Sequence, residues 1–128
     1  QAKERIKEKR EKALAEEERF KELKSKFFGI HFSDGLIQIK VLESVEEHLV
    51  EGEIMHHCVF SCSYHLKAES LILSATIEGR RIETVEINLK TLEVVQSRGI
   101  CNQNTEYHDR IVALVNKNRN LISSRLVA

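Results

Sequence analysis

The sequence contains no proline and no tryptophan, and only 5% of its 128 residues are aromatic. Without proline, long irregular loops are not expected. No apolar run approaches the length that crosses a membrane, and no signal-peptide pattern is present, so we expect no membrane insertion. Positive and negative charges balance to a formal net charge of zero, which leaves no whole-molecule field to attract nucleic acid or lipid. A chain of this length can bury a single core.

Cysteine is scarce, with Cys58, Cys62 and Cys101 the only three. An odd number of cysteines without a secretory signal favours reduced thiols, so we expect a cytoplasmic protein. The chain opens on Gln1 rather than on methionine, and we expect it to be a piece of a longer protein.

Charge is unevenly distributed along the chain. Residues 1–26 hold ten Lys or Arg and seven Asp or Glu, a net charge of +3, which leaves −3 for the remainder. Ala, Leu, Glu, Lys and Arg dominate this stretch, and all are good helix formers. We predict a charged helix or linker over residues 1–26, followed by a globular domain over residues 27–128. An apolar residue at every seventh position leaves a coiled-coil seam as the alternative for the helix. The residues at this spacing are Ile6, Ala13, Phe20 and Phe27.

Alternating apolar residues predict a hairpin and a three-stranded meander. In the hairpin, Asp34-Gly35 is a typical two-residue turn, and pairing Ser33 with Leu36 places six apolar residues on one face. They are Phe28, Ile30, Phe32, Ile37, Ile39 and Val41. The predicted strands of the meander are Leu71–Ile77, Arg81–Leu89 and Leu92–Arg98.

Helices are predicted on either side of the meander. Ser44 and Glu47 form a capping box that opens a short helix, which Gly52 is placed to end. Residues 55–67 are predicted to be helical again. An amphipathic stripe predicts a last helix over residues 104–123. The predicted fold class is α+β, with an antiparallel sheet packed against short helices and a C-terminal helix.

The register of the meander decides which side chains share a face. A two-residue turn at Lys90-Thr91 pairs Glu83 with Arg98, and it places Glu83, Gln96 and Arg98 at one end of the apolar face. The opposite face is expected to meet water. It holds Ser74, Thr76, Thr84, Glu86, Asn88 and Ser97.

Two short polar motifs interrupt this apolar framework. One is His56-His57-Cys58, and the other is Gln96-Ser97-Arg98-Gly99, with Asn102 just beyond. Polar groups in an apolar setting are costly unless they have partners, so these motifs mark the candidate site.

The residue types in the motifs suit the handling of an anionic oxygen. We predict that His57 acts as a general acid or base, that Glu83 orients it, and that Gln96 or Arg98 binds the oxygen. The alternative is a structural polar cluster that pins the motif helix to the end of the sheet. The residues expected to bind a ligand are Arg98, Gly99 and Asn102.

Metal and thiol chemistry are weaker interpretations of the first motif. His56, His57 and Cys58 have the residue types of a zinc site, with Cys62 one helical turn later. Adjacent residues on a helix point about 100° apart, so they cannot all face one ion. A nucleophilic Cys58 needs a base and an orienting group, and the predicted central strands supply no histidine. We expect neither a metal nor another cofactor.

Five separated segments follow one another in a characteristic order: His56–Val59, Ser70–Ser74, Arg81–Glu86, Gln96–Gly99 and Thr105–Ile111. Over residues 54–122, the chain resembles the PcfJ-like protein family. The positions that match the family's recurrent polar pattern are His57, Cys58, Gln96, Arg98, Gly99 and Asn102. The resemblance implies a cytoplasmic role around DNA transfer or processing in bacterial conjugative plasmids, integrative elements and phages. It implies no particular reaction.

These observations lead to one favoured function and two alternatives. The favoured function is a mobile-element accessory domain that contacts DNA or a DNA-processing protein. Its affinity for DNA should come from the basic N-terminal helix and Arg98, and should weaken with salt. The first alternative is an enzyme of phosphoester or nucleotide chemistry that uses His57, Glu83, Gln96 and Arg98. The second is a purely structural protein-interaction module.

Overall fold

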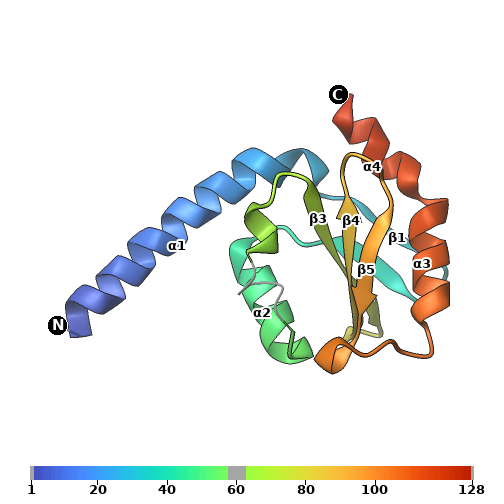
Figure 1. Ribbon diagram of the computed structural model, residues 1–128, viewed down its shortest axis with the longest axis horizontal. Helices are drawn as coiled ribbons and strands as arrows, with labels where there is room; N and C mark the ends of the chain where they lie inside the picture. The colour runs from blue at the N-terminus through green and yellow to red at the C-terminus, as the bar shows by residue number, and fades with distance from the viewer. Residues whose placement is uncertain (1, 58–62, 128) are drawn as a thin grey trace.

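The computed structural model describes residues 2–57 and 63–127, which are built around one antiparallel sheet (Figure 1). The five strands lie side by side in chain order, β1-β2-β3-β4-β5. Their bounds are β1 His31–Ser33, β2 Gln38–Val41, β3 Ser70–Ile77, β4 Arg80–Asn88 and β5 Val94–Arg98. The hairpin and the meander therefore join into one sheet, and the predicted α+β class is confirmed.

Helices flank the sheet on both sides, and α1 projects away from the rest of the molecule (Figure 1). Their bounds are α1 Ala2–Lys24, α2 Val45–Met55, α3 His108–Lys117 and α4 Arg119–Leu126. Three short 3₁₀ turns complete the described elements: η1 Ser25–Phe27, η2 Tyr64–Leu66 and η3 Ile100–Asn102. None of the helices in the described ranges is long and apolar enough to cross a membrane.

One face of the sheet, which we call the apolar face, forms the main core with α3 and α4. Alternate strand residues point into it and are at most 2% exposed. They include Ile39, Val41, Leu71, Leu73, Val85 and Ile87. Ile111 and Val115 of α3 and Ile122 of α4 pack against them. Removing this apolar surface from water is the main stabilising contribution expected for such a face.

The C-terminal segment forms two helices where one was predicted. Asn118 separates α3 from α4, with φ −111° and ψ 18°. Its side-chain amide donates a hydrogen bond to the backbone oxygen of Leu114 at 2.8 Å. That bond satisfies one of the carbonyls left unpaired at the end of α3, so the helix can stop there.

The opposite face of the sheet, which we call the polar face, was expected to meet water, and that expectation is wrong. Ser70, Ser74, Thr84 and Glu86 on this face are 7%, 2%, 4% and 7% exposed. The helix α2, the turn η2 and the C-terminal part of α1 lie over them. Period-two alternation identifies a polar face, but it cannot show whether a helix returns to cover that face.

The first hairpin has the predicted faces but a different register. Ser33 pairs with Gln38 and Phe32 with Ile39, and Asp34 donates its N–H to the oxygen of Ile37. The turn is therefore Gly35-Leu36 rather than Asp34-Gly35. A shift of two residues leaves every side chain on its predicted face, because the alternation has a period of two.

The pairing of β4 with β5 differs from the prediction in a way that moves the site. Ile87 pairs with Val94 as expected, but a β-bulge follows, so Val85 faces Ser97 and Thr84 faces Arg98. The extra residue reverses the alternation beyond it. Gln96 and Arg98 therefore lie on the polar face, and the predicted cross-strand pair of Glu83 with Arg98 does not form.

Helix α2 begins as predicted and ends later. Ser44 Oγ accepts a hydrogen bond from the N–H of Glu47 at 3.0 Å, which confirms the N-cap. The helix passes through Gly52 to Met55, and His56 closes it in the left-handed conformation, with φ 54°. The predicted helix over residues 55–67 is wrong in its described part, because only the 3₁₀ turn η2 is helical after His56. The rest of that prediction falls on residues 58–62, outside the described ranges.

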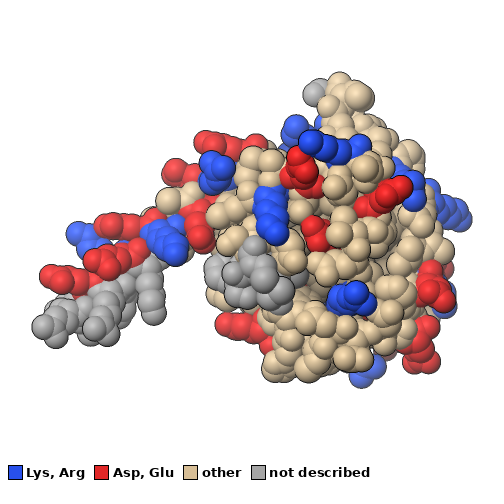
Figure 2. Space-filling model, in the orientation of Figure 1, with Lys and Arg blue, Asp and Glu red and all other residues tan. Residues whose placement is uncertain are grey.

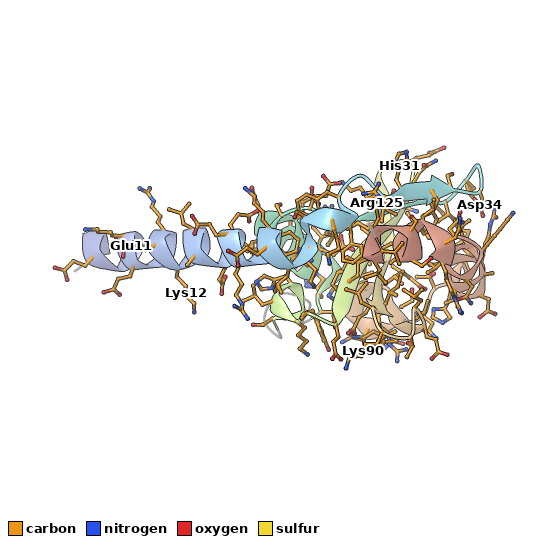
Figure 3. All side chains as sticks on the ribbon, turned by 90° about the horizontal axis from the view of Figure 1, so that it is seen from above. Glu11, Lys12, His31, Asp34, Lys90 and Arg125 are labelled. Atoms are coloured by element: carbon orange, nitrogen blue, oxygen red, sulfur yellow. The ribbon has the colours of Figure 1, made fainter. Side chains whose placement is uncertain are left out.

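Only the last part of α1 packs against the domain. Phe20 and Lys24 are each 1% exposed, whereas Leu14 is 67% exposed. Glu11 and Lys12 lie on the projecting part of the helix (Figure 3). Phe20 and Phe27, two of the residues at heptad spacing, are buried inside this molecule. The division between residues 26 and 27 stays a prediction.

Candidate functional site

A small pocket opens on the polar face where α2, η2 and β5 meet. It is lined by His57, Tyr64, Ile72, Thr84, Glu86, Gln96, Arg98 and Asn102. Four of the six residues predicted to act at the site, His57, Gln96, Arg98 and Asn102, are thus brought together from three separate segments. Glu83 and Gly99 do not line this pocket.

Glu51 of α2, which sequence reasoning missed, is the buried carboxylate nearest to His57 in the hydrogen-bond network. It is 0% exposed. Its side chain accepts hydrogen bonds from Ser74 Oγ at 3.0 Å and from Arg81 Nε at 2.7 Å. The hydroxyl of Thr84 also donates to it. Helical spacing could have predicted that Glu51 is buried, because it lies on the same side of α2 as His48 and Met55.

His57 is held between the end of α2 and the sheet. Its Nε2 lies 2.9 Å from Thr84 Oγ1. Burial lowers the pKa of His57, and the negative charge of Glu51 opposes that shift only in part. Nδ1 is buried without a hydrogen-bond partner in residues 2–57 and 63–127. Burial therefore favours the neutral form of His57, in which one ring nitrogen is engaged.

Glu86 forms the acidic floor of the pocket. It accepts hydrogen bonds from Ser70 Oγ at 2.7 Å and from Gln96 Nε2 at 2.8 Å. Behind it, the ammonium of Lys24 donates to the backbone oxygen of Ser70. Burial lowers the pKa of Lys24 to about 8, although the charge of Glu86 acts in the opposite direction. One amide N–H of Gln96 is thus engaged by a carboxylate, and its second N–H and its carbonyl oxygen are left for a ligand.

Arg98 is the cation at the rim of the pocket. Its side chain is exposed, and Nη1 donates a hydrogen bond to Asn104 Oδ1 at 3.0 Å. The turn after β5 brings Asn102 to the same rim through two successive left-handed residues, Cys101 with φ 57° and Asn102 with φ 63°. One guanidinium and one amide therefore flank the opening.

Gly99 has a packing role in the same turn. A Cβ atom there would lie 2.7 Å from Thr105 Cγ2, 2.9 Å from the oxygen of Gln103 and 3.1 Å from that of Ile82. The Gly99 N–H donates to the oxygen of Gln103 at 2.7 Å. The chain can approach itself this closely only without a side chain.

Glu83 lies on the other face of the sheet and joins β5 to the start of α3. Ser97 Oγ donates to it at 2.6 Å, and the N–H and hydroxyl of Thr105 donate at 2.8 and 2.7 Å. His108 Nδ1 lies 2.9 Å from Glu83 Oε1. Burial raises the pKa of this carboxyl, but the hydrogen bonds outweigh it, and the pKa of Glu83 is lowered. Its partners make it a clasp between the sheet and α3.

The cysteines needed by the zinc and thiol alternatives, Cys58 and Cys62, lie outside the described residues. Cys101 is exposed on the turn after β5. Within the described ranges, no three His, Cys, Asp or Glu side chains are grouped so that they could hold a metal ion.

Comparison with known proteins gives one match. The family model described as PcfJ-like protein matches residues 3–112, from the first turns of α1 into α3, and this range contains every residue of the pocket. No curated protein and no solved structure matches the chain. Because the family model covers most of its length, the chain belongs to the PcfJ-like protein family.

Proposed function

We propose that this protein is a cytoplasmic accessory domain of a bacterial mobile element and that it contacts nucleic acid through the pocket on the polar face. The observation that carries the proposal is the convergence of His57, Gln96, Arg98 and Asn102 on one opening. Membership of the PcfJ-like family supports the setting, and the side chains of the pocket support the class of ligand.

The pocket combines the groups that recognise a nucleotide in a single strand. Arg98 at the rim is suited to a phosphate, because a guanidinium can make two parallel hydrogen bonds to it. Tyr64 supplies an aromatic wall, and the ammonium of Lys67 lies 4.1 Å from the centre of its ring. Aromatic stacking with nearby cations is the usual means of binding unpaired bases. Side chains of this kind can reach the face and edges of a base that is splayed out of a single strand, but not those of a base stacked in a duplex.

Helix α1 offers a second, weaker electrostatic contact. Residues 1–26 carry a net charge of +3. Figure 2 shows, however, that basic and acidic side chains alternate along the visible face of α1. We therefore expect α1 to add affinity without sequence preference.

The test is a binding titration by fluorescence anisotropy, with a labelled single strand and the matching duplex, over a series of salt concentrations. We expect the single strand to bind more tightly and its affinity to fall as salt rises. Arg98→Ala should reduce the slope of log affinity against log salt by about 0.7, the value for one phosphate contact on a single strand.

Arg119→Ala is the matched control, because it removes the same charge from α4, where Arg119 contacts Asn116. Its slope should equal that of the wild type. Absence of binding at low salt, or equal losses in both variants, would contradict the proposal.

A second candidate function is an enzyme that acts on phosphoesters. The observation that favours it is the link from His57 through Thr84 to the buried carboxylate of Glu51, beside Arg98 at the rim. A histidine backed in this way is typical of general acid or base catalysis. The test is hydrolysis of phosphomonoester and phosphodiester substrates by the wild type, His57→Gln and Arg98→Ala. Loss of turnover in both variants at an unchanged melting temperature supports an enzyme, and no turnover in the wild type rejects it.

A further inference from the structure

A buried chain of hydrogen bonds ends on the ring of His57. At its inner end, Glu51 accepts from Ser74 Oγ at 3.0 Å and from Arg81 Nε at 2.7 Å. The hydroxyl of Thr84 donates to the other carboxylate oxygen. Thr84 Oγ1 lies 2.9 Å from His57 Nε2. Glu51 and Thr84 are 0% and 4% exposed, so bulk water does not replace these partners.

These hydrogen bonds determine which atom carries each hydrogen, from Glu51 to His57. Three donors converge on Glu51, so its carboxylate acts as the acceptor. Thr84 has one hydroxyl hydrogen and gives it to Glu51, so its oxygen is left to accept a hydrogen bond from His57. Nε2 of His57 must therefore carry a hydrogen.

The second ring nitrogen is left with a lone pair. Burial lowers the pKa of His57, which favours the neutral ring. A neutral imidazole with its hydrogen on Nε2 has an unprotonated Nδ1. That Nδ1 is buried and has no hydrogen-bond partner in the described part of the chain. A buried acceptor in this condition is uncommon in proteins and calls for a functional explanation.

We infer that Glu51 and Thr84 are positioning residues that hold His57 as its Nε2–H tautomer, and that Nδ1 is the hydrogen-bond acceptor left for a ligand whose binding uncovers it. For the ligand, this inference rests on the proposed contact with nucleic acid. The group that meets His57 must then carry a hydrogen, as an exocyclic amino group or ring N–H of a base does. The anionic phosphate oxygens are left to Arg98.

The test of the tautomer is nitrogen NMR of protein labelled with ¹⁵N-histidine at pH 7, with His57→Gln used to assign the ring signals. We expect the Nδ1 signal of His57 at the position of an unprotonated nitrogen and Nε2 at that of a protonated one. Thr84→Ser keeps the hydroxyl and should keep this pattern. Thr84→Val has nearly the same shape without the hydroxyl, and should shift both signals towards a mixture of tautomers.

Backbone amide spectra of the two variants establish that each is folded. A wild-type ring protonated on Nδ1, or on both nitrogens, at pH 7 overturns the tautomer assignment. So does a Thr84→Val variant that is folded and has the ring signals of the wild type.

The ligand is tested by adding the single-stranded oligonucleotide of the binding assay to the labelled protein. We expect the Nδ1 signal to move as the oligonucleotide saturates the protein. If the oligonucleotide binds and this signal stays in place, the ligand part of the inference is overturned and the nucleic-acid proposal stands. If nothing binds, both are overturned, and the tautomer of the free protein is decided separately by the spectra above.

Discussion

The two faces of the sheet are both buried, but they are held together by different interactions. The apolar face packs aliphatic side chains such as Leu73 and Val85, each 0% exposed, against α3 and α4. The polar face buries Ser74, Thr84 and Glu86 under α2 and η2. Burying polar groups is unfavourable unless each finds a partner, so the second face gains little from being buried. The stability of this face therefore depends on its hydrogen bonds rather than on the burial of apolar surface.

The largest expected effect comes from breaking the hydrogen-bond network of the polar face. Glu51→Ala removes the acceptor shared by Ser74, Arg81 and Thr84 and leaves buried donors without a partner. We expect the free energy of unfolding to fall by about 3–5 kcal/mol, the cost of removing one member of a buried ion pair. Urea unfolding followed by circular dichroism measures it.

The control for this variant is Glu11→Ala, which removes a carboxylate from the exposed part of α1 (Figure 3). It should change the free energy of unfolding by no more than about 0.5 kcal/mol. A cost below about 1 kcal/mol for Glu51→Ala would mean that the network does not hold the polar face together.

The apolar face should respond to a cavity instead. Leu73→Ala removes most of a side chain that is 0% exposed in the core, and so leaves a cavity there. We expect a loss of about 2–5 kcal/mol in the same unfolding experiment. Leu14→Ala, at a position that is 67% exposed on α1, is the control and should be nearly neutral. Equal effects of the two variants would contradict the placement of the core.

The two sides of the sheet should also lose stability in different ranges of pH. Burial lowers the pKa of His48, beneath α1, to about 4. The unfolded chain binds this proton first as the pH falls, so stability declines from the ordinary pKa of 6.5 down to about 4. Over that pH interval, the free energy of unfolding should fall by roughly 3 kcal/mol. On the apolar side, Glu83 has a lowered pKa, so its contribution to stability is lost only as the pH falls below 4.5, the ordinary pKa of a glutamate.

Urea unfolding repeated between pH 3 and pH 8 separates the two ranges. His48→Gln should make the upper decline shallower without abolishing it, because burial also lowers the pKa of His57 and of His65. Glu83→Gln should make the lower decline shallower in the same way, since Asp34 also has a lowered pKa. His31→Gln, on the exposed edge strand, is the control and should leave the curve unchanged (Figure 3). A wild-type curve that is flat between pH 7 and pH 5 would contradict the buried neutral state of His48.

The smallest expected effect concerns the turn that joins the two faces. Gly99→Ala places a methyl group 2.7 Å from Thr105 Cγ2 and 2.9 Å from the oxygen of Gln103. We expect a cost of about 1–3 kcal/mol, typical of overpacking. Thr105→Ser removes the clashing methyl group and keeps the hydroxyl that donates to Glu83. The double variant should therefore be more stable than Gly99→Ala, and an equal stability would show that this contact is not the cause.

Local patterns predicted most of the elements, because they depend on neighbouring residues. The strands of the meander, the N-cap at Ser44 and the shared apolar face of the first hairpin all follow from spacing of two to four residues. The hairpin kept its faces although its turn was misplaced, since its register moved by an even number. The continuous C-terminal helix failed at Asn118, where a side chain competes with the backbone for a carbonyl.

The side chains of the candidate site were proposed from the sequence, and the fold brings four of them together. The two polar motifs pointed to His57, Gln96, Arg98 and Asn102, which do line one pocket. The partner carboxylates were not predicted, because Glu51 and Glu86 reach the site from elements whose packing has no local signature. Glu83 was assigned to the site through a register that a single bulge displaces.

The sequence by itself determined an α+β domain with one strongly apolar sheet face and two polar motifs, since alternation and composition are properties of the chain. Only the tertiary structure decided which face those motifs occupy. One extra residue at the bulge in β5 reverses the direction of every side chain after it, so Gln96 and Arg98 point away from the core. The return of α2 across the sheet then buried that face and gave His57 its partner Thr84, whose hydroxyl donates to Glu51.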